Sequence, residues 1–220
     1  MSAKGRQGIN SPFFKRGGNE VDGVFMVIGL TGVFGSGKSA VRRFFRQRGA
    51  VAISADSLVH ALLRQENVKQ KITAKFGPGV LRKGEIDRIA LAKIVFRNDA
   101  KRKALEQILH PLVKAQIRKK VRTLLPLGKL VVVEVPLLFE SGFTDFFDYI
   151  VCVSAPLKII HKRMRKKGFS DAEIEQRWDS QWNLSEKEKR SGFVIDNSGS
   201  LFNTKKQVDI ILRGGTRCQR

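Results

Sequence analysis

The segment Gly32–Ser39 constrains the fold of this chain more than any other part of the sequence. It has the spacing glycine, four residues, glycine, lysine and serine. The apolar run Met26–Thr31 before it is typical of a buried strand, and residues 38–48 after it carry apolar side chains at helical spacing. Gly49 predicts the end of that helix. A glycine-rich loop between a strand and a helix is the first half of a βαβ unit.

Further strands are expected along the chain. They are short apolar segments with little polar alternation, the pattern of strands that are covered on both faces by helices. Their alternation with helical segments implies a parallel sheet with right-handed crossovers. We therefore expect an α/β fold, a parallel sheet flanked by helices. The later strands are expected at Ala50–Ser54, Lys129–Val135, Tyr149–Ser154 and Phe193–Asp196.

Most of the remaining chain reads as helix. Two glycine-containing breaks, at Gly77-Pro78-Gly79 and at Gly84, interrupt the first long helical stretch. Pro156 suits the start of a later helix. Helices are expected over most of 57–126, over Leu157–Lys167, over Asp171 to about Arg190 and over 203–212.

One domain, residues 26–212, is expected to hold all of these elements. Residues 1–25 are rich in glycine, serine and charge and lack the apolar core of a signal peptide, so we expect a disordered leader there. Met26 is then the hypothesised start of the native protein, and residues 213–220 are expected to be a short tail.

The glycine-rich loop has the chemistry of a phosphate-binding site. Glycines let the backbone wrap an anion with its N–H groups inward, and the start of the following helix adds partial positive charge. Lys38 is expected to reach the β- and γ-phosphates of a nucleotide, and the Ser39 hydroxyl to help hold Mg²⁺. Since the chain has no Asn-Lys-x-Asp guanine signature, we favour ATP and a P-loop NTPase-type fold. The expected ATP-binding residues are Gly32, Gly35, Ser36, Gly37, Lys38, Ser39 and Ala40.

Asp56 follows the second expected strand, at the edge of the sheet where folds of this class place their ligands. A kinase needs a carboxylate there to accept the proton of the attacking hydroxyl. The alternative is that Asp56 only caps a helix over Ser57–Leu63. Position alone does not decide between a catalytic and a capping Asp56.

Glu134 lies near the end of the valine-rich strand, where a carboxylate is costly to bury without a partner. It is a candidate to orient a water bound to Mg²⁺, and so to support the metal indirectly. The alternative is a structural glutamate in a salt bridge.

The helix after Pro156 is intensely basic. A lid over about 156–190 would bring its cations over the phosphates and neutralise charge in the transition state. The alternative is a solvated basic face. The candidate lid residues are Lys162, Arg163, Arg165 and Lys166.

Trp178 and Trp182 stand four residues apart on an expected helix. They could stack on an adenine, although core packing is the more common role of such a pair. His110, before Pro111, could hydrogen-bond a phosphate or cap the local backbone.

The charge of the chain indicates anionic partners. The sequence has 42 Lys and Arg against 20 Asp and Glu, a net charge of +22, which attracts nucleotides, coenzyme A, RNA or acidic membranes alike. No apolar run approaches the length of a membrane span, and the two cysteines, Cys152 and Cys218, form no disulfide or metal pattern. A reducing, cytoplasmic location is therefore expected, with nucleic acid bound only nonspecifically if at all.

Several short segments together resemble the dephospho-CoA kinase family over about residues 26–200. Each is weak alone, but their order and spacing are specific, and Val135–Glu140 is the most distinctive because other P-loop kinases lack it. The matching segments are Ile28–Ser39, Ser54–Asp56, Phe76-Gly77, Asp87-Arg88, Val95-Phe96, Leu105-Glu106, His110-Pro111, Val135–Glu140, Arg177 with Gln181, Val194–Asn197 and Gly199-Ser200.

The resemblance implies a reaction. ATP would phosphorylate the ribose 3′-hydroxyl of dephospho-CoA, giving coenzyme A and ADP in the last step of coenzyme A synthesis. It also implies a helical substrate region, about 57–126, and a mobile lid. In this sequence Asp56 is then the catalytic base, and Arg88 and His110 lie toward the substrate.

The chain departs from the family pattern at a few positions. Ser54 stands in place of the first aspartate of an Asp-Ala-Asp motif, which removes one of two carboxylates. Val33 replaces a loop glycine, and Ala40 replaces a serine or threonine. Lys162 and Lys166 stand where the family usually has arginine, and lysine cannot make bidentate contacts.

Two other functions remain open from the residues alone. One is a kinase for another small hydroxylated metabolite or nucleotide. The other, suggested by the net charge of +22, is a nucleotide-dependent protein that binds RNA or the ribosome. Against it, the chain lacks an RNP-type aromatic pattern, and its basic residues are spread over many expected helices.

Overall fold

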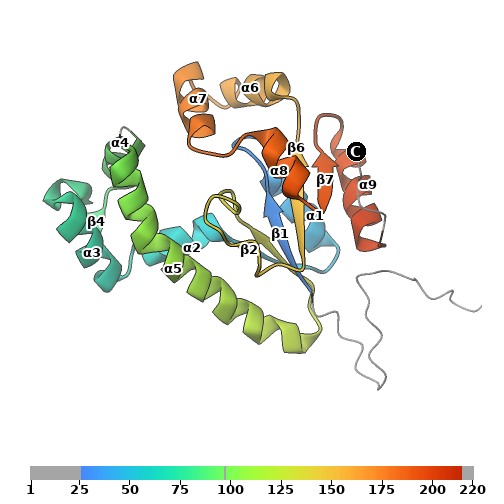
Figure 1. Cartoon of the computed structure of the whole chain (residues 1–220), viewed down its shortest axis with the longest axis horizontal. Helices are drawn as coiled ribbons and strands as arrows, with labels where there is room; N and C mark the ends of the chain where they lie inside the picture. Colours follow the sequence, from blue (N-terminus) through green and yellow to red (C-terminus); the bar gives the residue numbers. More distant parts are fainter. Residues whose placement is uncertain (1–25, 97, 215–220) are drawn as a thin grey trace, which may run out of the picture.

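A computed structural model describes residues 26–96 and 98–214, so the expected leader and residues 215–220 of the expected tail lie outside the described residues. Its centre is a sheet of five parallel strands in the order β2-β5-β1-β6-β7 (Figure 1). All five expected strands are present, three of them shorter by one to three residues than predicted. They are β1 (Val27–Thr31), β2 (Val51–Ser54), β5 (Val131–Glu134), β6 (Tyr149–Ser154) and β7 (Phe193–Asp196).

β1 lies in the middle of the sheet, between β5 and β6. The chain first builds the half of the sheet on the β5 side and then crosses to the β6 side, so the strand order changes direction next to β1. In open α/β sheets such a switch point, at the carboxyl ends of the strands, is where ligands bind. The loop that follows β1 therefore has the position of a binding site.

Helices cover both faces of the sheet and make it the middle of three layers. On one face, Val41 and Phe45 of α1 and Val208 of α9 pack against Ile28 and Val151 of the strands. On the other face, apolar side chains of α2 and α5 pack together with the segment that follows β5. The expected α/β class is thereby confirmed. The four helices are α1 (Lys38–Gln47), α2 (Ala55–Leu62), α5 (Asp99–Leu124) and α9 (Leu201–Leu212).

A second, smaller apolar core lies beside the sheet, at the left of Figure 1, where α3 and α4 pack against the first half of α5. The expected glycine breaks are present there: Gly77 has a φ of 84° and Gly84 a φ of 77°. Gly84 lies in the turn of a short hairpin, β3 with β4, that the sequence analysis did not predict. The elements of this region are α3 (Glu66–Phe76), the 3₁₀ turn η1 (Pro78–Val80), β3 (Leu81–Arg82), β4 (Glu85–Ile86) and α4 (Arg88–Phe96).

The region expected to form a lid contains three helices: α6 (Leu157–Arg165), α7 (Asp171–Asp179) and α8 (Leu184–Arg190). The single helix expected over Asp171–Arg190 is therefore wrong. The Asn183 side chain accepts a hydrogen bond from the Glu186 N–H at 2.9 Å and begins a new helix. Trp178 is consequently on α7, whereas Trp182 lies in the break before α8, so the two are not on one helix.

Across residues 26–96 and 98–214, we find no helix that combines the length and the apolar character needed to cross a bilayer. Cys152, on β6, is fully buried, and burial raises the pKa of its thiol to about 12. A buried thiol that stays protonated is a poor nucleophile, so this environment does not favour a reactive Cys152.

Candidate functional site

The glycine-rich loop runs from the end of β1 to the first residue of α1. Gly32, Gly35 and Gly37 have φ angles of 140°, 82° and 99°, a region of backbone space that favours glycine. Gly37 precedes α1, and no side chain caps the helix there. The first N–H groups of α1 therefore face the loop and are free to bind an anion.

Lys38 lies inside the loop, with only 8% of its surface exposed. Its ammonium donates to the carbonyl oxygens of Gly32 and Val33, both at 2.9 Å. Burial lowers the pKa of Lys38 to about 8, an effect that the negative charge of Glu134 opposes. The ammonium is thus held where a phosphate would arrive, in surroundings that disfavour its charge until an anion is present.

Glu134 lies beside Ser39 because β5 pairs with β1 and places Glu134 opposite Leu30. The Ser39 hydroxyl donates to Glu134 Oε1 at 3.4 Å, and Arg42 Nε lies 3.2 Å from Glu134 Oε2. Burial raises the pKa of Glu134, and Arg42 and Lys38 oppose that rise. The salt bridge expected as an alternative role is therefore present, and the carboxylate also contacts Ser39.

Mg²⁺ is bound in proteins through oxygen ligands such as carboxylates. It usually keeps several waters and binds the phosphate oxygens of a substrate as well. Ser39 and Glu134 supply a hydroxyl and a carboxylate oxygen next to the loop. The residues present thus fit a magnesium ion that is bound chiefly through nucleotide phosphates.

Asp56 lies in the first turn of α2, directly after β2, and its side chain is exposed. The cap of α2 is Ser54, whose hydroxyl oxygen accepts a hydrogen bond from the Ser57 N–H at 3.3 Å. The alternative reading of Asp56 as the helix cap is therefore wrong, and α2 begins two residues earlier than expected. Within the described part of the chain the Asp56 carboxylate has no hydrogen-bond or ion-pair partner.

β2 and β5 bring Asp56 to the same edge of the sheet as Glu134, because the register pairs Ser54 with Glu134. The carboxylates of Asp56 and Glu134 are close enough to act electrostatically on the Lys38 ammonium. Four groups thus converge at the ends of neighbouring strands: an ammonium, a hydroxyl and two carboxylates. This set can bind a polyphosphate and accept a proton from a hydroxyl beside it.

Arg88 and His110 lie in the helical region beside the sheet. Arg88 begins α4 and is exposed at a groove of about 440 Å³ that Arg82, Ile86 and Ile89 also line. His110 is half-buried in α5, and burial lowers its pKa. Neither side chain makes a hydrogen bond or ion pair to another residue that the structure describes, so the expected capping alternative for His110 is not seen.

The four candidate lid residues differ in their surroundings. Arg163 donates to the carbonyl oxygens of Asn197 and Ser198 at 2.8 and 3.3 Å. Arg165 pairs with Asp171 at 2.6 Å on the outer surface. The exposed side chains of Lys162 and Lys166 have no ion-pair partner among the described residues. Two of the four cations are therefore free in this state, and the two arginines already have partners.

The two tryptophans pack against protein. The Trp178 indole N–H donates to the Phe34 carbonyl at 3.1 Å. The Trp182 ring stacks on Phe139 at 5.8 Å, and the Arg190 guanidinium lies over it at 4.9 Å. Both tryptophans thus have the packing role in this structure.

Other residues contact the loop without having been assigned a role from the sequence. Gln181 accepts a hydrogen bond from the Phe34 N–H at 2.9 Å, and Asn197 donates to the Ser36 carbonyl at 2.8 Å. The sequence analysis named both only within segments that resemble a family. Their partners are backbone atoms far away in the chain, which no local pattern reveals.

Comparisons with known proteins bear on this geometry. The family model for dephospho-CoA kinase matches residues 26–203. A dephospho-CoA kinase of Geobacillus kaustophilus is 41% identical over 192 residues, covering 86% of this chain and 96% of the relative. One from Aquifex aeolicus is 39% identical over 192 residues, covering 86% of this chain and 97% of the relative.

Two solved structures are similar to the whole described fold. TT1252 from Thermus thermophilus is 35% identical with a TM-score of 0.74, and 85% of this chain and 96% of that chain are covered. A dephospho-CoA kinase from Campylobacter jejuni is 31% identical with a TM-score of 0.64, covering 85% and 95%. With the glycine-rich loop and these matches in agreement, the chain belongs to the dephospho-CoA kinase family.

Proposed function

We propose that this chain transfers the γ-phosphoryl group of ATP to the ribose 3′-hydroxyl of dephospho-CoA, with Asp56 as the base that accepts the hydroxyl proton. The observation that carries the proposal is the convergence of Lys38, Ser39, Glu134 and Asp56 at one edge of the sheet. Since Asp56 is exposed and does not cap its helix, its carboxylate is available to a substrate.

The division of labour follows from the positions of the groups. The N–H groups of the loop and of the first turn of α1 bind the β- and γ-phosphates. Lys38 exchanges the Gly32 and Val33 carbonyls for a phosphate oxygen. Gly32, Gly35, Ser36, Gly37 and Ala40 shape the surrounding backbone.

Ser39, through its hydroxyl, and Glu134, indirectly, would hold Mg²⁺ in this proposal. When bound, Mg²⁺ neutralises charge on the phosphates. Arg42 keeps the Glu134 side chain in place through the contact at 3.2 Å.

The substrate side belongs to the helical region. Arg88 and His110, which lack partners among the described residues, contact dephospho-CoA there. Lys162 and Lys166 approach the phosphates when the lid closes, whereas Arg163 supports the loop after β7. ATP and dephospho-CoA are the expected partners, and the cytoplasm is the expected location.

The decisive test is a coupled assay with ATP, Mg²⁺ and dephospho-CoA that follows both ADP and coenzyme A. We expect both products in equal amounts. Absence of both at ample enzyme would refute the assignment, and a panel of other hydroxylated metabolites would then identify the acceptor.

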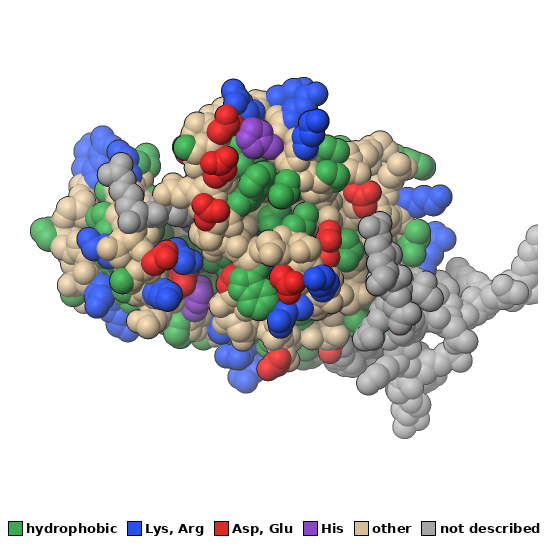
Figure 2. Space-filling view, turned by 45° about the horizontal axis from the view of Figure 1, so that its top comes forward, with side chains coloured by type: hydrophobic (Ala, Val, Ile, Leu, Met, Phe, Trp, Pro, Cys, Tyr) green, Lys and Arg blue, Asp and Glu red, His purple; other side chains and the backbone are tan. Residues whose placement is uncertain are grey.

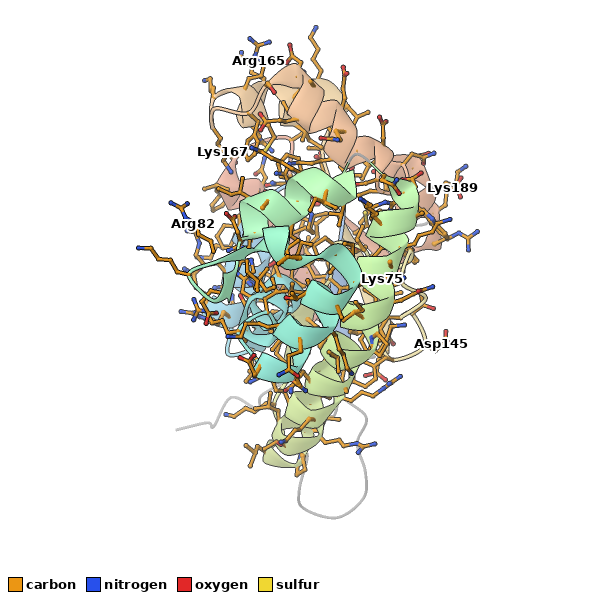
Figure 3. All side chains as sticks on the ribbon, turned by 90° about the vertical axis from the view of Figure 1, so that its left-hand side faces the viewer. Lys75, Arg82, Asp145, Arg165, Lys167 and Lys189 are labelled. Carbon is orange, nitrogen blue, oxygen red and sulfur yellow. The ribbon has the colours of Figure 1, made fainter. Side chains whose placement is uncertain are left out.

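The role of Asp56 has its own test. Asp56→Asn should lower kcat by about 10²–10⁴-fold, because it removes the base, and should leave the Kd for ATP unchanged. Asp145→Asn is the matched control, since Asp145 is an exposed aspartate away from the loop (Figure 3). Near-normal turnover of Asp56→Asn would exclude Asp56 as the base.

A further inference from the structure

The phosphate loop satisfies only some of its backbone groups by itself. The Ser36 N–H donates to the Val33 carbonyl at 3.2 Å, and Lys38 binds the Gly32 and Val33 carbonyls. Phe34 and Ser36, at the outer side of the loop, use partners from elsewhere in the chain. The hydrogen bonds to those partners fix the direction in which the peptide groups of the loop point.

Three side chains from the last third of the chain hold these peptides. The Trp178 indole N–H donates to the Phe34 carbonyl at 3.1 Å, and the Phe34 N–H donates to Gln181 Oε1 at 2.9 Å. The Asn197 amide donates to the Ser36 carbonyl at 2.8 Å. Trp178 is on α7, Gln181 lies in the break before α8, and Asn197 follows β7.

The planar geometry of the peptide bond links the direction of these carbonyl groups to the direction of the neighbouring N–H groups. In a trans peptide, the C=O of one residue and the N–H of the next point in opposite directions. With the Phe34 and Ser36 carbonyls drawn outward, the N–H groups of Gly35 and Gly37 point to the opposite side. Together with the N–H groups of Lys38 and Ser39, they have no acceptor within residues 26–96 and 98–214.

Asn197 is itself held firmly and is only 4% exposed. Its Oδ1 accepts a hydrogen bond from the Thr204 hydroxyl at 2.9 Å, which leaves the amide nitrogen toward Ser36. Arg163 donates to the Asn197 carbonyl at 2.8 Å. A Cβ on Gly37 would overlap the Asn197 amide, so this side chain sits directly against the loop.

The Phe34 side of the loop is equally well supported. The Phe34 ring packs edge-on against Phe169 at 5.2 Å, and the Arg177 guanidinium lies 4.7 Å from its centre. A Cβ on Gly35 would meet Ile160 and Met164 of α6. The α6–α7 unit therefore packs on the outside of the loop and carries Trp178 with it.

We propose that Trp178, Gln181 and Asn197 are positioning residues that hold the phosphate loop in its binding shape before ATP arrives. The inference rests on the proposed function, because it assigns the preset N–H groups to the phosphates of ATP. A loop that is already ordered loses less conformational entropy on binding, which strengthens binding without any direct contact to the ligand.

Three single variants test the proposal. Gln181→Met removes an acceptor at similar size, Trp178→Phe removes the indole N–H, and Asn197→Asp replaces a donor by an acceptor. The matched controls make the same exchanges at Gln107, Trp182 and Asn203. Of these, Asn203→Asp adds the same charge on the first turn of α9, six residues from Asn197.

Binding is measured by calorimetry with ATP, AMP and dephospho-CoA, and folding by the melting temperature. Each of the three variants should weaken ATP binding by about tenfold, the effect of one lost hydrogen bond to a buried group. AMP and dephospho-CoA should bind as they do to the unchanged protein, since neither places a phosphate in the β- and γ-phosphate positions of the loop. The control variants should keep full affinity for ATP.

Unchanged ATP affinity in Gln181→Met and Asn197→Asp would overturn the proposal. So would an equal loss for ATP, AMP and dephospho-CoA with a lower melting temperature, which indicates a purely structural role. Should Asn197→Asp not fold, Gln181→Met and Trp178→Phe decide alone. Failure of the unchanged protein to bind ATP at all would instead refute the proposed function.

Discussion

At the scale of one residue, Lys38 is held by the carbonyl groups of its own loop. Its ammonium is buried, binds two carbonyls of its own loop, and has a pKa lowered to about 8 by burial. A polyphosphate would supply the negative charge that the site lacks, and an adjacent opposite charge raises the pKa of an ammonium. We therefore expect the binding of ATP to be coupled to the protonation of Lys38.

The expected coupling determines whether protons are taken up or released when ATP binds. Because burial lowers the pKa of Lys38 to about 8, we expect a substantial share of the free protein to carry a neutral Lys38 near pH 8.5. ATP raises that pKa, so binding should take up protons, and the uptake should vanish below about pH 6.5, where Lys38 is already charged. Calorimetry in two buffers of different ionisation enthalpy measures it.

Lys38→Arg is the control for this prediction, because a guanidinium keeps its proton throughout the range. The variant should bind ATP without the uptake. If it takes up as many protons as the unchanged protein, another group is responsible and the prediction is wrong.

The residues proposed to bind phosphate could be anticipated from the sequence, and the residues that contact their loop from elsewhere in the chain could not. Lys38 and Ser39 belong to one short motif whose spacing carries its chemistry. Gln181 and Asn197 meet the loop across 147 and 161 residues of chain. Such contacts depend on tertiary packing, and a glutamine or asparagine has many possible partners.

At the scale of elements, the segment after β5 anchors the start of α8. Glu140 Oε1 accepts a hydrogen bond from the backbone N–H of Trp182 at 2.8 Å. The same oxygen forms an ion pair with the Lys187 ammonium at 2.7 Å. Lys187 is fully buried and also donates to the Pro136 carbonyl at 2.8 Å. The distinctive Val135–Glu140 segment thus joins the sheet to the end of the expected lid region.

Breaking this ion pair from one side should be costly. Lys187→Met leaves the Glu140 charge without its buried partner and should lower the free energy of unfolding by about 3–5 kcal/mol. The double variant with Glu140→Gln should lose clearly less than the sum of the single losses. Urea denaturation measures both quantities.

Lys189→Met is the control, because Lys189 forms an ion pair with Glu186 on the surface, where its side chain is 72% exposed. It should change stability by less than about 1 kcal/mol. Strictly additive losses at Lys187 and Glu140 would count against a coupled pair.

Strands and most helices could be predicted because apolar runs and glycines mark them locally. The break between α7 and α8 was missed, since residues 180–183 contain neither proline nor glycine. Its cause is partly local, the Asn183 cap, and partly tertiary, the bond from the Trp182 N–H to Glu140. The cap was a signal available in the sequence, whereas the tertiary bond was not.

At the scale of the whole molecule, positive charge is spread over many elements. Figure 3 shows Arg82 on the hairpin, Arg165 and Lys167 around the end of α6, and Lys189 on α8, all reaching outward. In Figure 2 the blue side chains likewise form several groups rather than one track. A dispersed charge of +22 attracts polyanions without reading their sequence.

RNA binding should accordingly be weak and sensitive to salt. A retardation assay with single-stranded RNA should show binding at 50 mM salt and a loss of about 10³-fold or more by 200 mM, as expected for purely electrostatic contacts. Unrelated RNA sequences should behave alike. Tight binding that resists 200 mM salt would point instead to a specific RNA partner.

The central place of β1 has a consequence for how the protein is made. β1 is the first strand of the sheet to leave the ribosome, yet its neighbours begin only at Val131 and Tyr149. Throughout that interval of translation both edges of an apolar strand are open, which is the condition in which growing chains associate wrongly. Assembly of the sheet must wait for distant partners, so we expect it to be completed late in synthesis and to depend on chaperones that shield the nascent N-terminal half.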